Sequence, residues 1–471
     1  MRESSPPNPT TAPLAPQLLA QIWQGLDGAA AQLSAVGLIG NGDLPSVFGV
    51  SDLAQASVAA AGLAAAELAQ AMGGATPALR CDRRLASMWF ASSLRPDGWT
   101  APALWDAVAG DYRCQDGWIR LHTNAPHHRI RALEVLELDP QAQREQVAAA
   151  VAGWRGVELE QAIVAHGGCA AEMRSQSQWQ AHPQGQAVAG EALVAQARFD
   201  AGWRAKGSPD PARPLAGVRV LDLTRVLAGP TATRMLAGLG AEVLRIDPDW
   251  WDEPGVVPEM TLGKRCARLD LRAPGQRATF AALLAQADVL VHGYRGGALE
   301  GLGLGQQWRR QCNPALVDVA LDAYGWSGPW AGRRGFDSLV QMSAGVAHAG
   351  MRELGRDRPT PLPVQALDHA TGYLMAAAAL RGLTLRWQDG VGSDWRLSLA
   401  RTALLLTQQA PDAAQKEALA PETADDLGPA IEATAWGPAR RLRDALEIDG
   451  VPLHWTLPAG PLGSAPAAWL D

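Results

Sequence analysis

The sequence predicts an α/β protein whose second half is a doubly wound domain built on a parallel sheet. After residue 214, short runs of aliphatic and β-branched residues alternate with helical stretches. Runs without polar alternation are typical of parallel strands, which are buried on both faces. Glycine and proline stand at the junctions between these runs. Because strand, helix and strand repeat at this spacing, crossover connections of a parallel sheet are expected.

The elements of the second half can be placed in order. Residues 217–224 predict a buried strand, and Ala228, Gly229 and Pro230 predict a tight turn. Pro230 then stands in the first turn of a helix at 231–239, where a missing N–H costs nothing. Gly240 is expected to end this helix. The elements predicted after it are strands at 241–247, 287–292 and 315–323 and a helix at 276–286.

The chain as a whole is expected to divide into five parts. Residues 16–99 indicate a helical region with a long alanine-rich helix at 53–72 and a strand at 78–83, and residues 100–205 a small α+β domain with a turn at 115–117. A proline- and charge-rich connector at 206–214 separates the two halves. The full division is 1–15, a disordered lead-in; 16–99; 100–205; 214–410, the large α/β domain; and 411–471, a C-terminal return segment with a strand at 450–457.

Composition excludes several classes of protein. The 471 residues carry 41 basic and 48 acidic side chains, a net charge of −7 without a basic block, which argues against nucleic-acid binding. The five cysteines lack CxxC spacing and the nine histidines form no HExxH, so no metal site is expected. An odd, scattered cysteine set favours a reducing cytoplasm. Gln55, Glu67 and Gln70 interrupt the most apolar stretch, so no membrane span is predicted.

An internal repeat is suggested at an offset of 316 residues. Residues 52–90 and 368–406 align without gaps, and Asp52 matches Asp368 at the start of an alanine-rich helix in both. Both segments then continue through a glycine turn to a strand that carries an arginine. A duplication and a chance match between alanine-rich helices both explain these identities.

Asp368 has two interpretations. An aspartate directly before an alanine-rich helix is a favoured N-cap. The same position allows the helix dipole to keep a carboxylate ionised, and such a carboxylate can attack an activated carbonyl. His369 is expected to be a packing or polar partner and not a general base.

Phosphate-binding signals are weak. Gly301, Gly303 and Gly305 resemble a phosphate loop but miss the GxGxxG spacing and do not follow a strand. Several cations of the second half could contact phosphates, although most are expected to be solvated surface charges. They are Arg245, Lys264, Arg265, Arg272 and Arg295.

Five collinear motifs carry a resemblance to a known family. They are, in order, PLAGVRVLDLTRVLAGPTATRMLAGLGAEVLRID, GKRCARLDLRAPGQR, ADVLVHGYRGGALEGLG, NPALVDVALDAYGWSGPWAGRRGFDSLVQMSAG and PLPVQALDHATG. Together these motifs, over residues 214–406, resemble the large domain of class III (CaiB/BaiF-type) CoA-transferases. Residues 104–190 are similar to the family's smaller domain.

The resemblance implies a Rossmann-like large domain that binds acyl-CoA, and CoA transfer from one carboxylic acid to another. Asp368 matches the family's nucleophile, which forms an acyl anhydride and then an aspartyl-CoA thioester. Leu269, Arg272, Gly293 and Tyr294 match CoA-contacting positions. CoA would enter as part of the substrate, and no tightly bound cofactor is expected. The resemblance also implies an interlocked homodimer, although a fused chain could supply part of the dimer contact internally.

Departures from the family's pattern leave two alternatives open. The large-domain front follows the small domain here, so residues 16–92 could be the remnant of a first large domain, with Asp52 a relic. A shielding glycine loop is not found, and Leu227, Gly293 and Gly301 replace glutamine, asparagine and arginine; a silent CoA-binding or assembly subunit is therefore an alternative. An acyl-CoA racemase is a weaker one, because Phe336 replaces the histidine of the racemases' GxD motif.

Overall fold

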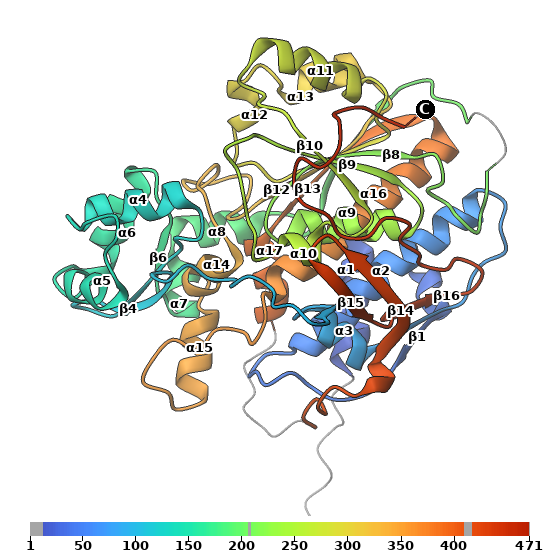
Figure 1. The fold of residues 1–471 in the computed structure, drawn as a ribbon. Helices are drawn as coiled ribbons and strands as arrows, with labels where there is room; N and C mark the ends of the chain where they lie inside the picture. The colour runs from blue at the N-terminus through green and yellow to red at the C-terminus, as the bar shows by residue number, and fades with distance from the viewer. Residues whose placement is uncertain (1–12, 206–208, 409–416, 471) are drawn as a thin grey trace, which may run out of the picture.

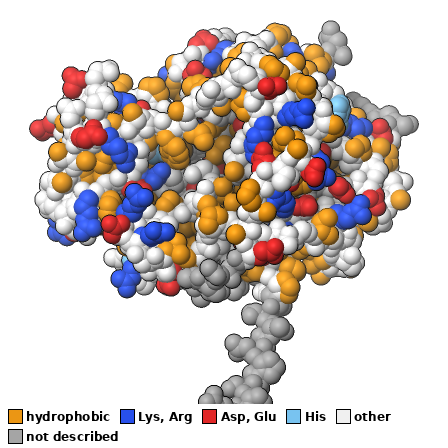
Figure 2. Space-filling view, turned by 60° about the horizontal axis from the view of Figure 1, so that its bottom comes forward, with side chains coloured by type: hydrophobic (Ala, Val, Ile, Leu, Met, Phe, Trp, Pro, Cys, Tyr) orange, Lys and Arg blue, Asp and Glu red, His pale blue; other side chains and the backbone are white. Residues whose placement is uncertain are grey.

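The computed structural model describes residues 13–205, 209–408 and 417–470. A large α/β body carries most of the chain, and a small lobe projects from one side of it (Figure 1). The lobe lies at the left of the view and holds β4–β6 and α4–α8. On the face drawn in Figure 2, basic and acidic side chains are interspersed.

The body is built on a seven-stranded sheet of order β10-β9-β8-β11-β12-β13-β7, in which only β7 is antiparallel to its neighbour. The predicted parallel sheet is therefore confirmed, and four of its strands lie within the ranges expected from the sequence. The strands are β7 Ala195–Asp200, β8 Arg219–Leu223, β9 Glu242–Asp247, β10 Lys264–Arg268, β11 Val289–His292, β12 Val317–Asp322 and β13 Val391–Ser398.

Both faces of this sheet are covered at its centre, which is why β8, β11 and β12 are largely aliphatic. Val220 packs into the cluster beneath α9 and α16, whereas the next residue, Leu221, packs into the cluster beneath α11. The predicted helix at 231–239 begins earlier, at Ala228. The helices of this half are α9 Ala228–Gly238, α10 Val257–Met260, α11 Pro274–Leu284, α12 Ala298–Gly301, α13 Gln306–Cys312, α14 Asp337–Ser343, α15 Val346–Glu353, α16 Ala366–Asp389 and α17 Leu399–Thr407.

The N-terminal region packs directly on this body. Its alanine-rich helix α2 lies against α16, because small side chains let the two backbones approach, and Glu67 pairs with Arg381 between them at 2.5 Å. Leu14 already lies in α1, so the disordered lead-in predicted to end at residue 15 is too long; residues 1–12 lie outside the described residues. The elements are α1 Leu14–Gly25, η1 Ala30–Ala35, β1 Val36–Ile39, α2 Val50–Ala71, β2 Leu79–Asp82 and α3 Arg83–Trp89.

The small lobe has its own hydrophobic core, and its β4–β5 hairpin confirms the turn predicted at 115–117. The segment then leaves the lobe, since β7 joins the central sheet beside β13. A short strand, β3 Leu94–Pro96, precedes the lobe. The lobe's elements are β4 Gly110–Arg113, β5 Trp118–Leu121, β6 Ala170–Glu172, α4 Pro126–Val135, α5 Arg144–Val151, α6 Gly156–Ala165, α7 Gln176–Ala181 and α8 Pro183–Gly190.

The C-terminal segment returns to the N-terminal region. β14 Leu427–Thr434 and β15 Gly437–Leu442 form a sheet with β3, and β16 Leu446–Ile448 pairs with β2; η2 Ala424–Asp426 precedes them. The strand predicted at 450–457 is wrong, because this described stretch contains no strand and packs against the end of α9 instead. There His454 N–H donates to Gly238 O at 2.8 Å, and Trp455 stacks near Trp89.

The two segments of the suggested repeat share unusual local geometry. The residues before α2 and α16, Gly49 and Gln365, have φ/ψ of −75°/61° and −76°/64°. In both, the first helical N–H donates to the oxygen two residues earlier, at 2.9 and 2.8 Å. The strand after each helix also has a parallel neighbour on one side and an antiparallel neighbour on the other: β1 and β16 for β2, β12 and β7 for β13.

Candidate functional site

Two cavities meet at the beginning of α16. One has a volume of about 540 Å³ and is called the arginine-lined cavity here, because Arg225, Arg272, Arg295, Arg333 and Arg334 line it. The other has a volume of about 520 Å³, and its wall includes residues from both halves of the chain; it is called the apolar cavity. Three residues line both, namely Val226, Phe336 and Asp368.

All five residues that the resemblance selected lie around the arginine-lined cavity. Leu269 and Arg272 follow β10, Gly293 and Tyr294 follow β11, and Asp368 is in the first turn of α16. Ligands of open α/β sheets bind at this carboxyl edge of the strands. A Cβ atom at position 293 would meet its nearest neighbour among the described residues, the Leu321 side chain, at 3.8 Å, so Gly293 leaves room beside the backbone here.

The arginine-lined cavity also holds residues that sequence reasoning missed. The Arg225 guanidinium lies 4.0 Å from the centre of the Trp251 ring and 4.9 Å from that of Tyr294. In the described part of the chain, Arg295 and Arg334 have no ion-pair partner, although both line the cavity. Arg225 follows β8, and its place at the end of a predicted parallel strand was the signal that could have identified it.

Two of the five candidate cations are neither solvated nor free to contact phosphates. Arg245 is fully buried and pairs with Asp247 at 2.8 Å, and Lys264 is buried and pairs with Asp222 at 3.0 Å. Neither can leave its partner without exposing an unpaired charge to the protein interior. Arg265 pairs with Glu242 at 3.1 Å. Of the five cations, Arg272 and Arg295 alone line this cavity.

The glycine run of the sequence does not form a phosphate loop. Gly301 ends α12 and Gly305 directly precedes α13, so the run connects two short helices and does not follow a strand. Gly303 has a φ of +75°, which explains a glycine there by backbone conformation.

Asp368 is not an N-cap. Gln365 holds that position, and Asp368 is the third residue of α16. Its backbone N–H donates to Oδ2 of Asp337 at 2.9 Å, but no group among the described residues donates to its own carboxylate oxygens. The residue is 7% exposed and lines both cavities. Its carboxylate therefore faces open space with its hydrogen-bonding capacity unused.

The electrostatics of Asp368 differ from the expectation of a carboxylate held ionised by the helix dipole. Burial raises the pKa of Asp368 well above its usual range, and the charge of Asp337 raises it further. Burial also raises the pKa of Asp337 to about 6, against hydrogen bonds from Asp368 N–H and Gln341. Asp368 is thus a basic carboxylate, which is a stronger nucleophile once it loses its proton.

The histidines near Asp368 are neutral packing groups. The His369 ring stacks on Phe90 with centroids 5.3 Å apart, and burial lowers its pKa to about 3. His122 stacks on Phe336 at 3.7 Å, and burial holds its pKa well below the usual range. The expectation that His369 is a packing partner is borne out by these contacts.

Asp52 occupies the matching place in α2 but has a different environment. Arg83 pairs with it at 2.9 Å and with Asp43 at 2.5 Å. The offset of 316 places Leu399 where Arg83 stands, and Leu399 lines the arginine-lined cavity. A guanidinium therefore pairs with the Asp52 carboxylate, whereas no guanidinium among the described residues pairs with Asp368.

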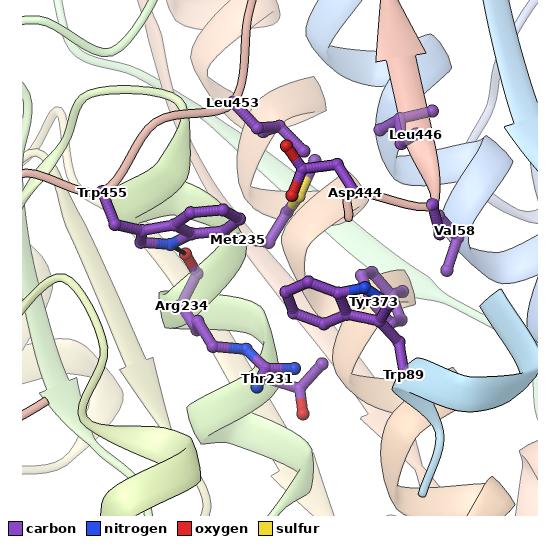
Figure 3. A pocket seen from close by; sticks show the side chains of 11 residues that line it. Val58, Trp89, Thr231, Arg234, Met235, Tyr373, Asp444, Leu446, Leu453 and Trp455 are labelled. Carbon is purple, nitrogen blue, oxygen red and sulfur yellow. Dashed lines mark hydrogen bonds between the residues drawn. The ribbon is translucent and has the colours of Figure 1, made fainter. Parts of the chain in front are cut away.

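A third, small cavity of about 20 Å³ lies between α2, α9, α16 and the C-terminal segment. Figure 3 shows the Asp444 carboxylate there among Leu453, Met235 and Trp455. Burial raises the pKa of Asp444 to about 7. This cavity has room for about one water molecule and does not reach Asp368.

Comparisons with known proteins agree on one family. Residues 215–435 match the model of CoA-transferase family III. Over 196 residues the chain is 36% identical to the "Probable fatty acyl-CoA transferase Rv3272" of Mycobacterium tuberculosis, covering 39% of this chain and 49% of that protein. It is 34% identical over 202 residues to the mouse succinyl-CoA:glutarate CoA-transferase, covering 40% and 46%.

The chain thus spans about half the length of these relatives. Among solved structures, the orthorhombic crystal form of the Mycobacterium tuberculosis protein aligns with a TM-score of 0.37 and 32% identity, covering 42% of this chain and 58% of that one. Within the residues that the structure describes, no helix has both the length and the apolarity to cross a membrane.

Proposed function

We propose that the protein transfers CoA from an acyl-CoA to a free carboxylic acid, with Asp368 as covalent nucleophile. The premise is the match of residues 215–435 to the model of CoA-transferase family III. One observation carries the proposal. The Asp368 carboxylate accepts no hydrogen bond from the described residues and stands where an arginine-lined cavity and an apolar cavity meet.

The arginine-lined cavity suits the nucleotide end of CoA. Arg272 and Arg295 supply positive charge for the phosphates, and guanidinium groups bind phosphate oxygens in bidentate fashion. Trp250 and Trp251 supply aromatic faces for the adenine. Leu269, Gly293 and Tyr294 would line the path of the pantetheine arm toward Asp368.

The reaction proceeds by acyl exchange at Asp368. A carboxylate oxygen attacks the thioester carbonyl, the C–S bond breaks, and the CoA thiolate leaves with the electron pair, which gives a mixed anhydride. The thiolate then attacks the aspartyl carbonyl, releases the first acid as its carboxylate and leaves an aspartyl-CoA thioester. The acceptor carboxylate repeats both steps in reverse order, so that a new acyl-CoA forms and Asp368 is regenerated.

Trapping with hydroxylamine tests this mechanism. Incubation with acyl-CoA and hydroxylamine should yield a hydroxamate on the peptide that contains Asp368, detected by mass spectrometry, and none in Asp368→Asn. Asp444→Asn, which removes another buried carboxylate, is the matched control and should keep the label. A label on Asp52 would contradict the assignment. Stabilisation by CoA without any labelled carboxylate would favour a silent CoA-binding subunit.

We also propose that residues 16–92 are a degenerate copy of the large domain. The matched backbone before α2 and α16, and the shared strand neighbours, support a duplication. β7, which follows the small lobe, then completes the second copy's sheet, and β16 completes the first. The chain thereby supplies internally the contact that the family resemblance assigned to a homodimer. Light scattering of a catalytically active preparation should give the mass of a monomer.

A further inference from the structure

We propose that the acyl group carried by this protein is apolar and lacks a second charge, and that the apolar cavity holds it. This inference rests on the proposed function, because it uses Asp368 as the reacting group. If the arginine-lined cavity takes the nucleotide, the thioester carbon lies at Asp368 and the acyl chain must continue beyond it. The apolar cavity is the space on that side.

The chemistry of the apolar cavity argues against a dicarboxylate. None of the 24 described residues that line it is a lysine or an arginine. Its two histidines, His122 and His369, are held neutral by burial, which lowers the pKa of each. Glu259 adds a carboxylate, whose charge is already paired with Arg234 and Arg441. A distal carboxylate entering here would lose its water without gaining a cation.

The size of the cavity suits a chain longer than that of a short acid. Its 520 Å³ lies within the range of about 300–1,000 Å³ that holds whole small ligands. Aliphatic and aromatic side chains from both halves form its wall, among them Phe90, Leu94, Leu227, Val256 and Val364. Each methylene buried there would improve binding by roughly fourfold.

The mouth of the cavity exposes apolar side chains that a bound chain would cover. Leu104 is 58% exposed and Trp105 is 38% exposed, and both line the cavity. The segment is held in place on the small lobe, since Asp106 accepts hydrogen bonds from Thr123 Oγ1 and Arg129 Nη1 at 2.7 Å each. A bound apolar chain that covered this pair would remove further apolar surface from water, which favours its binding.

A panel of thioesters tests the inference. Butyryl-, hexanoyl-, octanoyl- and succinyl-CoA are compared by initial rates of hydroxamate formation on Asp368. We expect kcat/KM to rise roughly fourfold per methylene from butyryl- to octanoyl-CoA, and succinyl-CoA to react at least about 100-fold more slowly than hexanoyl-CoA. Succinyl-CoA within tenfold of hexanoyl-CoA would overturn the inference and leave the proposed function standing. If no thioester labels Asp368, the proposed function itself fails.

A variant at the mouth provides a second, directional test. Leu104→Arg adds a cation beside the cavity at an exposed position that tolerates the change. We expect it to raise the succinyl-to-hexanoyl ratio of kcat/KM by about tenfold or more, as one new charge-assisted contact allows. Ile431→Arg, at a 62% exposed position on β14 away from both cavities, is the matched control and should leave the ratio unchanged. An unchanged ratio in Leu104→Arg as well would overturn the inference.

Discussion

Glu259 joins the wall of the apolar cavity to the α/β body, and its replacement by glutamine should lower the free energy of unfolding substantially. The carboxylate accepts hydrogen bonds from Ser93 N–H at 3.1 Å, Ser93 Oγ at 2.7 Å and Leu94 N–H at 3.0 Å. It also pairs with the guanidinium groups of Arg234 and Arg441. Three parts of the chain, far apart in sequence, therefore share one buried negative charge.

The magnitude follows from the number of donors that lose their acceptor. In Glu259→Gln one carboxylate oxygen becomes an amide NH₂, which cannot accept and faces donors instead. The Arg234 charge, which is only 1% exposed, then lacks its buried counter-charge, whereas Arg441 keeps Glu432 at 2.6 Å. Removing one partner of a buried ion pair costs about 3–5 kcal/mol, so we expect a loss of this size.

Urea unfolding followed by tryptophan fluorescence measures the loss. Glu447→Gln is the control, since Glu447 pairs with Arg80 at 3.0 Å on the surface and should contribute at most about 1 kcal/mol. The two arginines hold the pKa of Glu259 well below its usual range. Its contribution is therefore present above about pH 4.3, the pKa of an unfolded glutamate, and is lost as the pH falls further.

The difference in the free energy of unfolding between wild type and Glu259→Gln should consequently become smaller below pH 4. A difference under about 1 kcal/mol at pH 7, or a gap that stays constant down to pH 3, would refute the reasoning, because either result means that the buried charge does not stabilise the fold.

Three further predictions concern carboxylates. Asp368→Asn should unfold at a higher urea concentration than wild type at pH 8, and at the same concentration at pH 4. The raised pKa of Asp368 makes its ionised form unfavourable only above about pH 3.9, the pKa of an unfolded aspartate. A variant less stable than wild type at pH 8 would contradict this. Asp444→Asn should likewise raise the free energy of unfolding, by at most about 4 kcal/mol above pH 7, since burial raises the pKa of Asp444 to about 7. An unchanged urea midpoint at pH 9 would show that this carboxylate is solvated. Arg83→Leu should lower stability by about 1–3 kcal/mol by leaving Asp52 and Asp43 unpaired, as urea unfolding can measure, whereas a gain in stability would show that the pair is not held by Arg83.

The sequence by itself predicted the parallel sheet and singled out Asp368 as a candidate nucleophile. Aliphatic runs bounded by glycine and proline are local signals, and a strand buried on both faces leaves little freedom in its composition. Asp368 was a candidate from its position before an alanine-rich helix, the four expected CoA contacts came from the resemblance alone, and the structure places all five around one cavity.

Local patterns failed where the environment came from distant residues. Arg245 and Lys264 looked like surface cations, but their carboxylate partners bury them within the sheet. The predicted strand at 450–457 was wrong because the local sequence does not reveal that the His454 N–H donates to the carbonyl of Gly238, at the end of α9, and not to a neighbouring strand.

Only the tertiary structure decided the character of the site. The basicity of Asp368 depends on burial and on Asp337, 31 positions earlier in the chain. The apolar cavity exists because residues 90–105, from the first half, close over the start of α16. Likewise, the pairings of β7 with β13 and of β16 with β2 join segments about 200 and 370 residues apart. Burial, charge coupling and strand pairing are properties of the space around a residue, and a local pattern cannot specify that space.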